Sequence, residues 1–223
     1  MIEAHQEQAL HAASQTKQRI LDAAERLFSQ HGFAATSLRR ITSEAQVNLA
    51  AVNYHFRSKE ELIQAVVLRK LDPINRRRLE ILDQLETGGV EPTIEELLHA
   101  FFGPIFEARR AGVQVCEFPK LLARAHTEPG DLMTRLLPAA FSEILARFGP
   151  AFRRALKVDQ LELMWGMHLA IGSMAHLLSG GAVLAFLSGG EADANDYDGA
   201  LRRLIRYTAS GLRALAEKEN VAG

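Results

Sequence analysis

The sequence has a single cysteine, no excess of charge of either sign and no strand-like pattern. Because Cys116 is the only cysteine, no disulfide can form within the chain, and a single cysteine suits a reducing cytosol. The formal net charge is −1 over 223 residues, so no overall basicity points to nucleic acid. No stretch alternates apolar and polar residues as a half-buried strand does. These absences exclude a disulfide-stapled domain and predict an all-α fold.

Neither a signal peptide nor a membrane helix is expected. The first residues, MIEAHQEQALHAAS, lack the basic start and apolar run of a signal peptide, and we expect residues 1–14 to form a flexible tail. The longest apolar block, residues 161–187, contains Glu162, two histidines and several glycines. It is therefore predicted to be a buried helix followed by a loop. We expect a cytoplasmic protein without a membrane partner.

Catalytic and metal-binding signatures are also missing. Cys116, His126 and Asp131 lie close together in the sequence but share no helical spacing and no known nucleophile signature. His168 and His176 are eight residues apart, and no carboxylate or cysteine completes a metal-ligand set at usable spacing. No glycine-rich loop for a phosphate is present. We expect no enzyme activity, no metal and no cofactor.

Charge is distributed unevenly along the chain. Between Ser14 and Glu60, seven lysines and arginines stand against four acidic residues, an excess of +3 that leaves −4 for the rest. A local excess of positive charge is the direction that contact with DNA requires. Nucleic-acid contact is therefore expected in this stretch.

The same stretch has the pattern of two short helices around a tight turn, followed by a third helix. Thr36 or Ser37 is suited to cap the first helix and Asn48 the second, because their side-chain oxygens accept hydrogen bonds from free N–H groups of a first turn. Gln46 lies at the turn. The pattern therefore predicts a helix-turn-helix.

The second short helix has two different faces. A rotation of about 100° per residue places Val52 and Phe56 on one side, with small, amide and aromatic residues on the other. The second face fits a major groove: Leu49 and Ala50 allow close approach to a thymine methyl, and Asn53 can pair with adenine through two hydrogen bonds. On geometry alone, an ordinary three-helix packing unit is the alternative.

Phosphate contacts are expected on the flanks of this unit. Tyr54, His55 and Lys59 are placed to reach phosphate oxygens, which position a protein on DNA without reading its sequence. Ser58 and Glu61 form the S-x-x-E pattern of a capping box, so Lys59 lies in a first helical turn, whose free N–H groups also favour phosphate. The predicted DNA-binding residues are Thr36, Ser37, Asn48, Leu49, Ala50, Asn53, Tyr54, His55 and Lys59.

A resemblance to a known family supports this interpretation. Residues 16–70 resemble the TetR family of bacterial transcription regulators at fixed spacing. Gln46 departs from the pattern, since the family usually has glycine there, and a left-handed non-glycine residue costs about 1 kcal/mol. The stretch VNLAAVNYHF and the later chain look most like the PsrA-type, fatty-acid-responsive branch. The matching motifs include His31-Gly32-Phe33, Thr36-Ser37-Leu38, Tyr54-His55-Phe56 and Ser58-Lys59-Glu60-Glu61-Leu62.

The resemblance implies a homodimer that controls transcription, in most of the family as a ligand-controlled repressor of a palindromic operator in double-stranded DNA. Residues 15–72 would form the helix-turn-helix domain, and residues 73–223 a helical domain for ligand binding and dimerisation. The two long helices expected after Asp159 and after Asp196 or Asp198 are candidates for a four-helix interface with a second copy. A ligand-independent DNA-binding or architectural protein with a solid second domain is the alternative.

The expected effector is a small apolar molecule, with a fatty acid or its acyl thioester as the leading candidate. Prolines would bend the second domain's helices, and bent helices with aromatic and thioether side chains can enclose a cavity. A tightly filled core is the alternative. The predicted pocket consists of Phe101, Phe102, Ile105, Phe106, Phe118, Phe141, Met164, Trp165 and His168. Other candidates for the head group of the ligand are Arg109, Arg110, Lys120 and Arg124.

Prolines and charge runs give further expectations. Pro73 is expected to end or kink the helix that starts at Lys59, and Gly149-Pro150 to end the helix before it. Another helix is expected to begin near Pro119. The run of residues 76–78, three arginines, is expected to be a solvated or salt-bridged face rather than a DNA contact.

Overall fold

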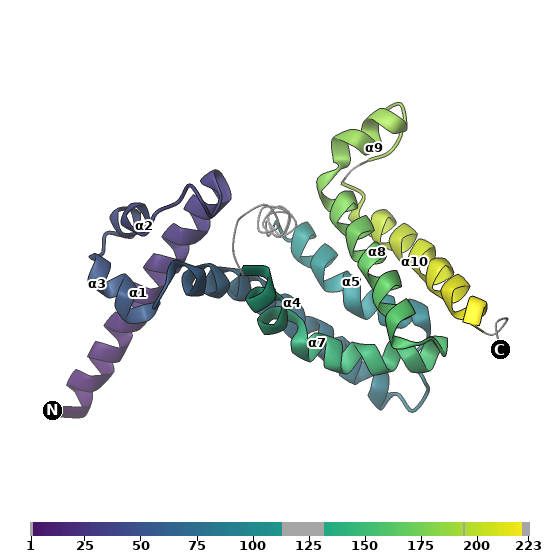
Figure 1. Ribbon diagram of the computed structural model, residues 1–223, viewed down its shortest axis with the longest axis horizontal. Coiled ribbons are helices and arrows are strands. Elements are labelled where there is room, and N and C mark those ends of the chain that lie inside the picture. The colour runs from purple at the N-terminus through teal and green to yellow at the C-terminus, as the bar shows by residue number, and fades with distance from the viewer. Residues whose placement is uncertain (1, 113–131, 194, 220–223) are drawn as a thin grey trace. The chain divides into compact units, whose positions relative to one another are not determined.

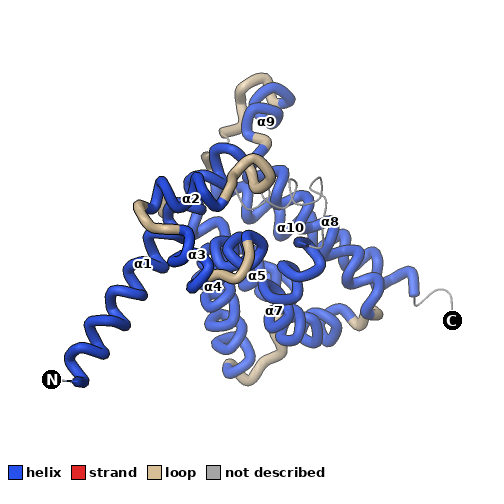
Figure 2. Tube along the Cα trace, turned by 60° about the vertical axis from the view of Figure 1, so that its left-hand side comes forward, coloured by secondary structure: helices blue, strands red, loops and turns tan. Residues whose placement is uncertain are grey.

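The computed structural model describes residues 2–112, 132–193 and 195–219, and within these ranges the chain is helical, without strands. The predicted all-α fold is confirmed (Figures 1 and 2). The helix expected near Pro119 lies outside the described residues. The helices are α1 (Ile2–His31), α2 (Leu38–Ala45), α3 (Leu49–His55), α4 (Lys59–Thr87), α5 (Ile94–Arg110), α7 (Leu132–Leu156), α8 (Gln160–Ser179), α9 (Gly181–Leu187) and α10 (Tyr197–Glu219).

The chain forms two compact units. The first contains α1, α2, α3 and the start of α4 to Leu71, with the start of α7 to Ala139. The second contains the rest of α4, from Asp72, together with α5, the rest of α7, α8, α9 and α10. One continuous helix, α4, therefore contributes residues to both units.

The N-terminal residues are helical, which corrects the predicted flexible tail. α1 begins at Ile2 and runs without interruption to His31. Residues 2–14 contain alanine, glutamine, glutamate and leucine, which favour helix, and no glycine or proline that would end it. High helix propensity therefore extends α1 beyond the part that packs in the first unit.

Prolines do not end the helices in which they lie. α7 continues past Gly149-Pro150, so the helix end predicted there is wrong. α4 continues through Pro73, which excludes the end but not the kink that was expected there. A proline inside a helix removes one backbone hydrogen bond, and burial of apolar side chains beyond it, such as Leu82 and Phe152, offsets that loss. α7 instead ends before Lys157, which has a left-handed φ of 54°.

The apolar block at residues 161–187 forms α8 and α9, and the second of these is a short helix where a loop was predicted. No single helix in the described part of the chain is long and apolar enough to span a membrane. The pair α8 and α9 meets the length and composition only together, and it is bent by 84°.

α5 lies at the centre of the second unit's core. Thr93 and Glu96 form the capping box that starts it, and α5 packs against α10, which also packs against α8. Gly166 permits the close approach of α8 to α10, because a Cβ there would clash with Leu212. The core therefore depends on one small residue at a helix crossing as well as on apolar bulk.

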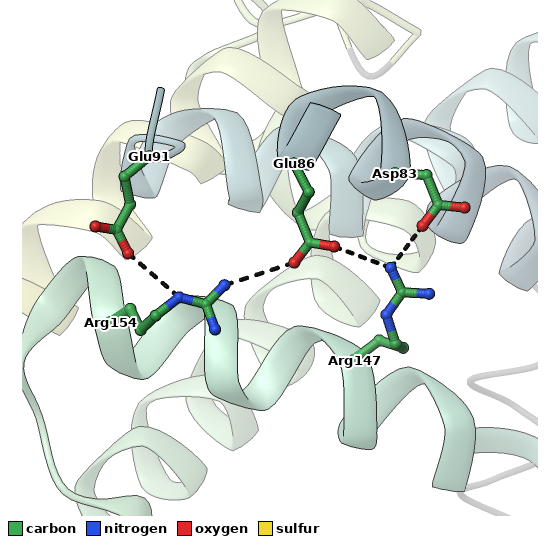
Figure 3. Close-up of polar contacts among 5 residues, drawn as sticks. All are labelled: Asp83, Glu86, Glu91, Arg147 and Arg154. Atoms are coloured by element: carbon green, nitrogen blue, oxygen red, sulfur yellow. Dashed lines mark hydrogen bonds and ion pairs between the residues drawn. The ribbon is translucent and has the colours of Figure 1, made fainter. Parts of the chain in front are cut away.

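Ion pairs join the end of α4 to α7, as Figure 3 shows. Arg147 lies 2.5 Å from Asp83 and 3.0 Å from Glu86. Arg154 lies 3.5 Å from Glu86 and 3.3 Å from Glu91, which follows α4. These side chains are largely solvated, so each pair is worth about 0.2–1 kcal/mol.

Candidate nucleic-acid interface and effector cavity

Side-chain caps start α2 and α3 where the sequence predicted them. The Ser37 hydroxyl accepts a hydrogen bond from the Arg40 N–H at 3.2 Å, and the Asn48 side chain accepts one from the Ala51 N–H at 2.8 Å. Gln46, at the turn between them, has φ 52° and ψ 48°. This left-handed conformation costs a non-glycine residue about 1–2 kcal/mol. The turn is therefore tight and held at both sides.

α1 braces this turn through side chains that bond to the end of α2. The Arg19 guanidinium donates to the carbonyls of Ala45 and Gln46, both at 2.6 Å, which are among the free carbonyls at the end of α2. Arg26 pairs with Glu44 at 3.0 Å. Sequence reasoning missed Arg19 because its partners are backbone atoms 26 and 27 residues away, which no side-chain pattern marks.

The turn after α1 places Thr36 inside the unit. Gly32 has a φ of 83°, and the rings of Phe28 and Phe33 meet edge-on at 5.1 Å, which is typical of a helix that ends in a left-handed glycine. The Thr36 side chain is 0 % exposed, and its hydroxyl donates to the Gly32 carbonyl at 2.8 Å. The Thr36 hydroxyl is therefore used internally, which argues against the predicted contact of Thr36 with DNA.

α3 presents the outward face that its sequence predicted. Leu49, Ala50 and Asn53 are exposed, and Tyr54 is 80 % exposed, whereas Val52 is buried. Burial of the opposite side fixes the rotation of the helix about its axis. A small-residue, amide and phenol surface is therefore displayed in a fixed orientation.

The start of α4 differs slightly from the predicted capping box. The Ser58 hydroxyl accepts from the Glu61 N–H at 3.1 Å, but the Glu61 carboxylate accepts from the Arg57 N–H at 3.0 Å, one residue before the expected donor. Lys59, in the first turn, is half-buried, with Nζ 3.5 Å from the Ala34 carbonyl. A contact of that length is weak, so the ammonium group remains available to an anion.

Arg69 and Lys70 tie α4 to α1 within the first unit. The Arg69 guanidinium bonds to Asp22 at 2.6 Å and to Glu25, and Lys70 lies 3.0 Å from Glu25. Burial raises the pKa of Glu25, but hydrogen bonds from the two cations outweigh it and hold that pKa below its ordinary value. The start of α4 is thus firmly attached to the helix that braces the turn.

An apolar cavity of about 150 Å³ lies between α5, α7 and α8 in the second unit. Among the residues that the structure describes, His168 is the one polar side chain in its lining, and the phenylalanine rings meet edge-on or tilted. A concave apolar surface with few polar groups is typical of small-molecule sites. The lining residues are Phe101, Leu145, Phe148, Gly149, Phe152, Leu163, Met164, Met167, His168 and Ile171.

The predicted pocket overlaps this cavity in Phe101, Met164 and His168. Trp165 is 54 % exposed, because its position on α8 is about 100° of rotation away from that of Met164. Phe118 lies outside the described residues. Four other predicted residues are not in the lining. Phe102, Ile105 and Phe106, on α5, are buried in the core, and Phe141, on α7, is half-buried.

Sequence reasoning missed the contribution of α7 to the cavity. Leu145, Phe148 and Phe152 follow one another at three- and four-residue steps, the spacing of one helical face. That spacing was readable in the sequence, but the expected helix end at Gly149-Pro150 divided it. If the helix had been predicted to continue through Pro150, these three residues would have been expected on one face of it.

The candidate head-group cations are placed elsewhere. Arg110 pairs with Asp198, and the guanidinium of Arg109 lies 5.8 Å from the centre of the Tyr197 ring. Neither of them lines the cavity. The other two candidates, at positions 120 and 124, lie outside the described residues.

The arginine run on α4 contains one buried cation. Arg77 is salt-bridged, as predicted, with Glu80 at 3.4 Å and Glu107 at 3.7 Å. Arg78 is only 2 % exposed: its Nε donates to the Phe101 carbonyl at 2.7 Å, and its guanidinium carbon lies 4.5 Å from the centre of the Phe101 ring. The predicted solvated or salt-bridged face is therefore wrong for Arg78.

Two known families match the chain. Residues 20–66 match the family described as bacterial regulatory proteins, tetR family, and residues 99–211, half of the chain, match the tetracyclin repressor-like C-terminal domain. The chain belongs to the TetR family. Its members are DNA-binding transcription regulators and generally ligand-responsive repressors.

Individual relatives agree with this assignment to the TetR family. The HTH-type transcriptional regulator SrpR of Pseudomonas putida is 26 % identical over 168 residues, 75 % of this chain and 74 % of SrpR. Among solved structures, the TetR-family regulator SCO4454 of Streptomyces coelicolor has a TM-score of 0.63 at 19 % identity, covering 95 % of both chains. FadR of Bacillus subtilis, in complex with stearoyl-CoA, has a TM-score of 0.59 at 14 % identity, covering 87 % of this chain and 98 % of FadR. The two structural likenesses show the shared fold.

Proposed function

We propose that this TetR-family chain is a ligand-responsive repressor that binds a palindromic operator as a homodimer through α3. The observation that carries the proposal is the outward face of α3, where Leu49, Asn53 and Tyr54 are exposed while Val52 is buried. Its width and polarity suit the major groove of DNA. In this proposal residues 15–72 bind DNA, and residues 73–223 bind the ligand and the second copy.

Each exposed group has a proposed role on DNA. Asn53 pairs with an adenine, and Leu49 and Ala50 contact thymine methyl groups. Tyr54 and Lys59 bind phosphate oxygens, which set the position of the helix on the duplex. The remaining proposed phosphate contacts come from the exposed or half-buried residues at the helix starts and at the end of α3: Ser37, Asn48 and His55.

The outward face of α8 supports the homodimer. Leu161, Trp165 and Leu169 are exposed at four-residue intervals, and Tyr207 is exposed on the neighbouring α10. A row of large exposed apolar side chains is typical of a protein–protein interface. In a symmetric dimer, the same face of a second copy covers this row. Two reading helices then contact two half-sites of the operator.

The proposed effector is predominantly apolar, with a fatty acid or acyl thioester as the first class to test. The apolar cavity supports it, and so does the resemblance to the PsrA-type branch. FadR, which shares the fold, binds stearoyl-CoA. Pockets for drug-sized ligands occupy about 300–1,000 Å³, so a long acyl chain requires the cavity of about 150 Å³ to widen. The cavity also favours a ligand-responsive protein over a ligand-independent one with a solid core.

The mechanism follows from linkage. An effector that binds more tightly to the DNA-free form than to the DNA-bound form lowers operator affinity by the ratio of its two affinities. The same ratio lowers the affinity of the effector when DNA is bound. A ligand with equal affinity for both forms changes nothing.

The test uses an operator selected from random DNA with the full-length protein. Saturated fatty acids of increasing length are titrated against the complex, and release is followed by fluorescence anisotropy of the DNA. Each buried methylene is worth about 0.8 kcal/mol, so the midpoint of release should fall with length until the cavity is full. A flat response, or release by small polar metabolites only, would contradict the apolar effector.

A further inference from the structure

We propose that the contact between Arg78 and Phe101 couples the effector cavity to operator affinity, with Arg78 acting as a positioning residue. The inference rests on the proposed function and adds to it the route by which the cavity acts on α4. The cavity is lined by α5, α7 and α8, and α4 contributes no residue to its lining. An effect of the cavity on α4 therefore has to pass through the helices that line it, and a wall residue that α4 contacts gives the shortest route.

Phe101 is such a residue. Its side chain lines the cavity. The Arg78 guanidinium carbon lies over the same ring, 4.5 Å from its centre, and Arg78 Nε donates to the carbonyl of the same residue at 2.7 Å. A shift of either the ring or the backbone of Phe101 therefore changes a direct contact with Arg78 of α4.

The charge of Arg78 makes this contact sensitive to ring orientation. No ion pair joins Arg78 to a carboxylate of the described residues, so its charge is stabilised by neutral groups alone. Burial lowers the pKa of Arg78 to about 9, and the group is still a cation at neutral pH. An aromatic ring attracts a cation at its face and repels it at its edge. A ligand that turns the Phe101 ring therefore weakens the hold on Arg78.

A second wall of the cavity reaches the same arginine. Arg78 Nη1 donates to Asn75 Oδ1 at 2.9 Å, and Asn75 Nδ2 donates to the Ala140 carbonyl of α7 at 2.8 Å. The residues that α7 contributes to the cavity follow Ala140 on the same helix. Arg78 is thus the point where polar contacts from α5 and α7 meet on α4.

The effect can travel along α4 itself. Arg78 lies nine residues, about two and a half turns, after Arg69, and Arg69 bonds to Asp22 of α1 in the first unit. α4 is a single helix over this distance, continuing through Pro73. The exposed ion pairs of Figure 3 also join α4 to α7, but they are largely solvated and screened by salt. The buried contact is therefore the one that the cavity can modulate.

The test is a double-mutant cycle on operator affinity, with the full-length protein and DNA that it has selected from a random pool. Arg78→Met removes the charge at similar volume, and Phe101→Leu removes the ring. Met167→Leu is the matched control, because Met167 also lines the cavity and is buried but lies on α8 and takes no part in the contacts that join Arg78 to α5 and α7. Kd for the operator is measured by anisotropy on protein that circular dichroism shows to be folded.

The expected result is a change in Kd of at least fivefold for Arg78→Met and a change in the same direction for Phe101→Leu. The double variant should differ from Arg78→Met by less than twofold, whereas the effects of Arg78→Met and Met167→Leu should multiply. Asn75→Ala, which leaves the Arg78 cation in place, should shift Kd in the same direction by a smaller factor. If Arg78→Met does not fold, Asn75→Ala is the variant that tests the proposal.

A lower melting temperature with Kd within twofold of the wild type would show a merely structural Arg78 and overturn the proposal. Multiplying effects of Arg78→Met and Phe101→Leu would do the same. If Arg78→Met does not fold, an unchanged Kd for Asn75→Ala overturns it. If the wild-type protein selects no DNA, the proposed function fails, and the coupling fails with it.

Discussion

Two aromatic side chains, one in each unit, lie in opposite surroundings: one on the proposed DNA-binding face and the other in the core. Tyr54 on α3 is 80 % exposed, whereas Phe102 on α5 is completely buried and surrounded by the core of the second unit. In the first unit, buried apolar residues fix the directions of the helices, and the polar face of α3 is exposed. The second unit lines its cavity with the buried rings of Phe101, Phe148 and Phe152. A surface that contacts base pairs needs exposed groups in fixed positions, whereas an effector site needs a deformable apolar interior.

The largest effect expected from this comparison is on stability. Phe102→Ala leaves a cavity in the core, and we expect it to lower the free energy of unfolding by about 3–5 kcal/mol. Tyr54→Ala should change that free energy by no more than about 0.5 kcal/mol, since its ring is solvated, while weakening operator binding. Urea unfolding followed by circular dichroism measures both variants. Equal losses of stability would remove the distinction between the two aromatic residues.

On DNA, the comparison is between two residues of the first unit. Asn53→Ala should cost about 1–3 kcal/mol of operator binding and relax the preference at one base pair in each half-site. Lys59→Ala should instead weaken all sequences alike and reduce the salt dependence of binding, because its partner is a phosphate. Binding to a panel of operators with single base changes separates the two. If both variants lower only the overall affinity, Asn53 does not read a base.

Within the second unit, two glycines of α8 offer a matched pair. A Cβ at Gly166 would clash with Leu212, and we expect Gly166→Ala to cost about 1–3 kcal/mol of stability through overpacking. A Cβ at Gly172 meets no atom of the same chain within 4 Å, so in the separated monomer Gly172→Ala should stabilise the helix by about 0.5–1 kcal/mol. Thermal unfolding of the two variants should therefore shift in opposite directions. Shifts of the same sign would contradict the close crossing of α8 and α10.

The smallest expected effect concerns acid. The pKa of Glu25 in the folded protein is below its ordinary value of 4.5, so its ionised form adds stability above that pH. This contribution is lost as pH falls below 4.5 and through the lowered pKa. The group is partly solvated, so we expect less than about 1 kcal/mol. Unfolding of wild type and Glu25→Gln between pH 7 and pH 3 measures it, and the two curves should converge on acidification. A difference that persists at pH 3 would assign the effect to packing.

The first unit was more predictable than the second because its determinants are local. The caps at Ser37 and Asn48, the left-handed Gly32 and the two faces of α3 all depend on residues within a few positions of one another. Such short-range rules are readable from sequence. The Arg19 contact was not, because it joins α1 to backbone carbonyls far along the chain.

The second unit depends on contacts that the sequence does not mark. Aromatic content predicted a cavity, but whether a phenylalanine lines it or fills the core depends on the rotation of each helix, as Phe101 and Phe102 show. Arg78 stands in a run of three arginines, yet only its tertiary neighbours bury it. Pro73 and Pro150 carry a local signal to stop, and packing beyond them overrides it.

Hydroxyl-radical footprinting of the selected operator, with the full-length protein, tests the central claim most directly. A homodimer that reads DNA with α3 should protect two equivalent half-sites related by a two-fold axis, with centres about 34–36 Å apart or a multiple of that distance. Protection at each half-site should weaken with Lys59→Ala. A single unsymmetrical footprint, or protection that is unchanged when Asn53 and Lys59 are both replaced by alanine, would contradict the account.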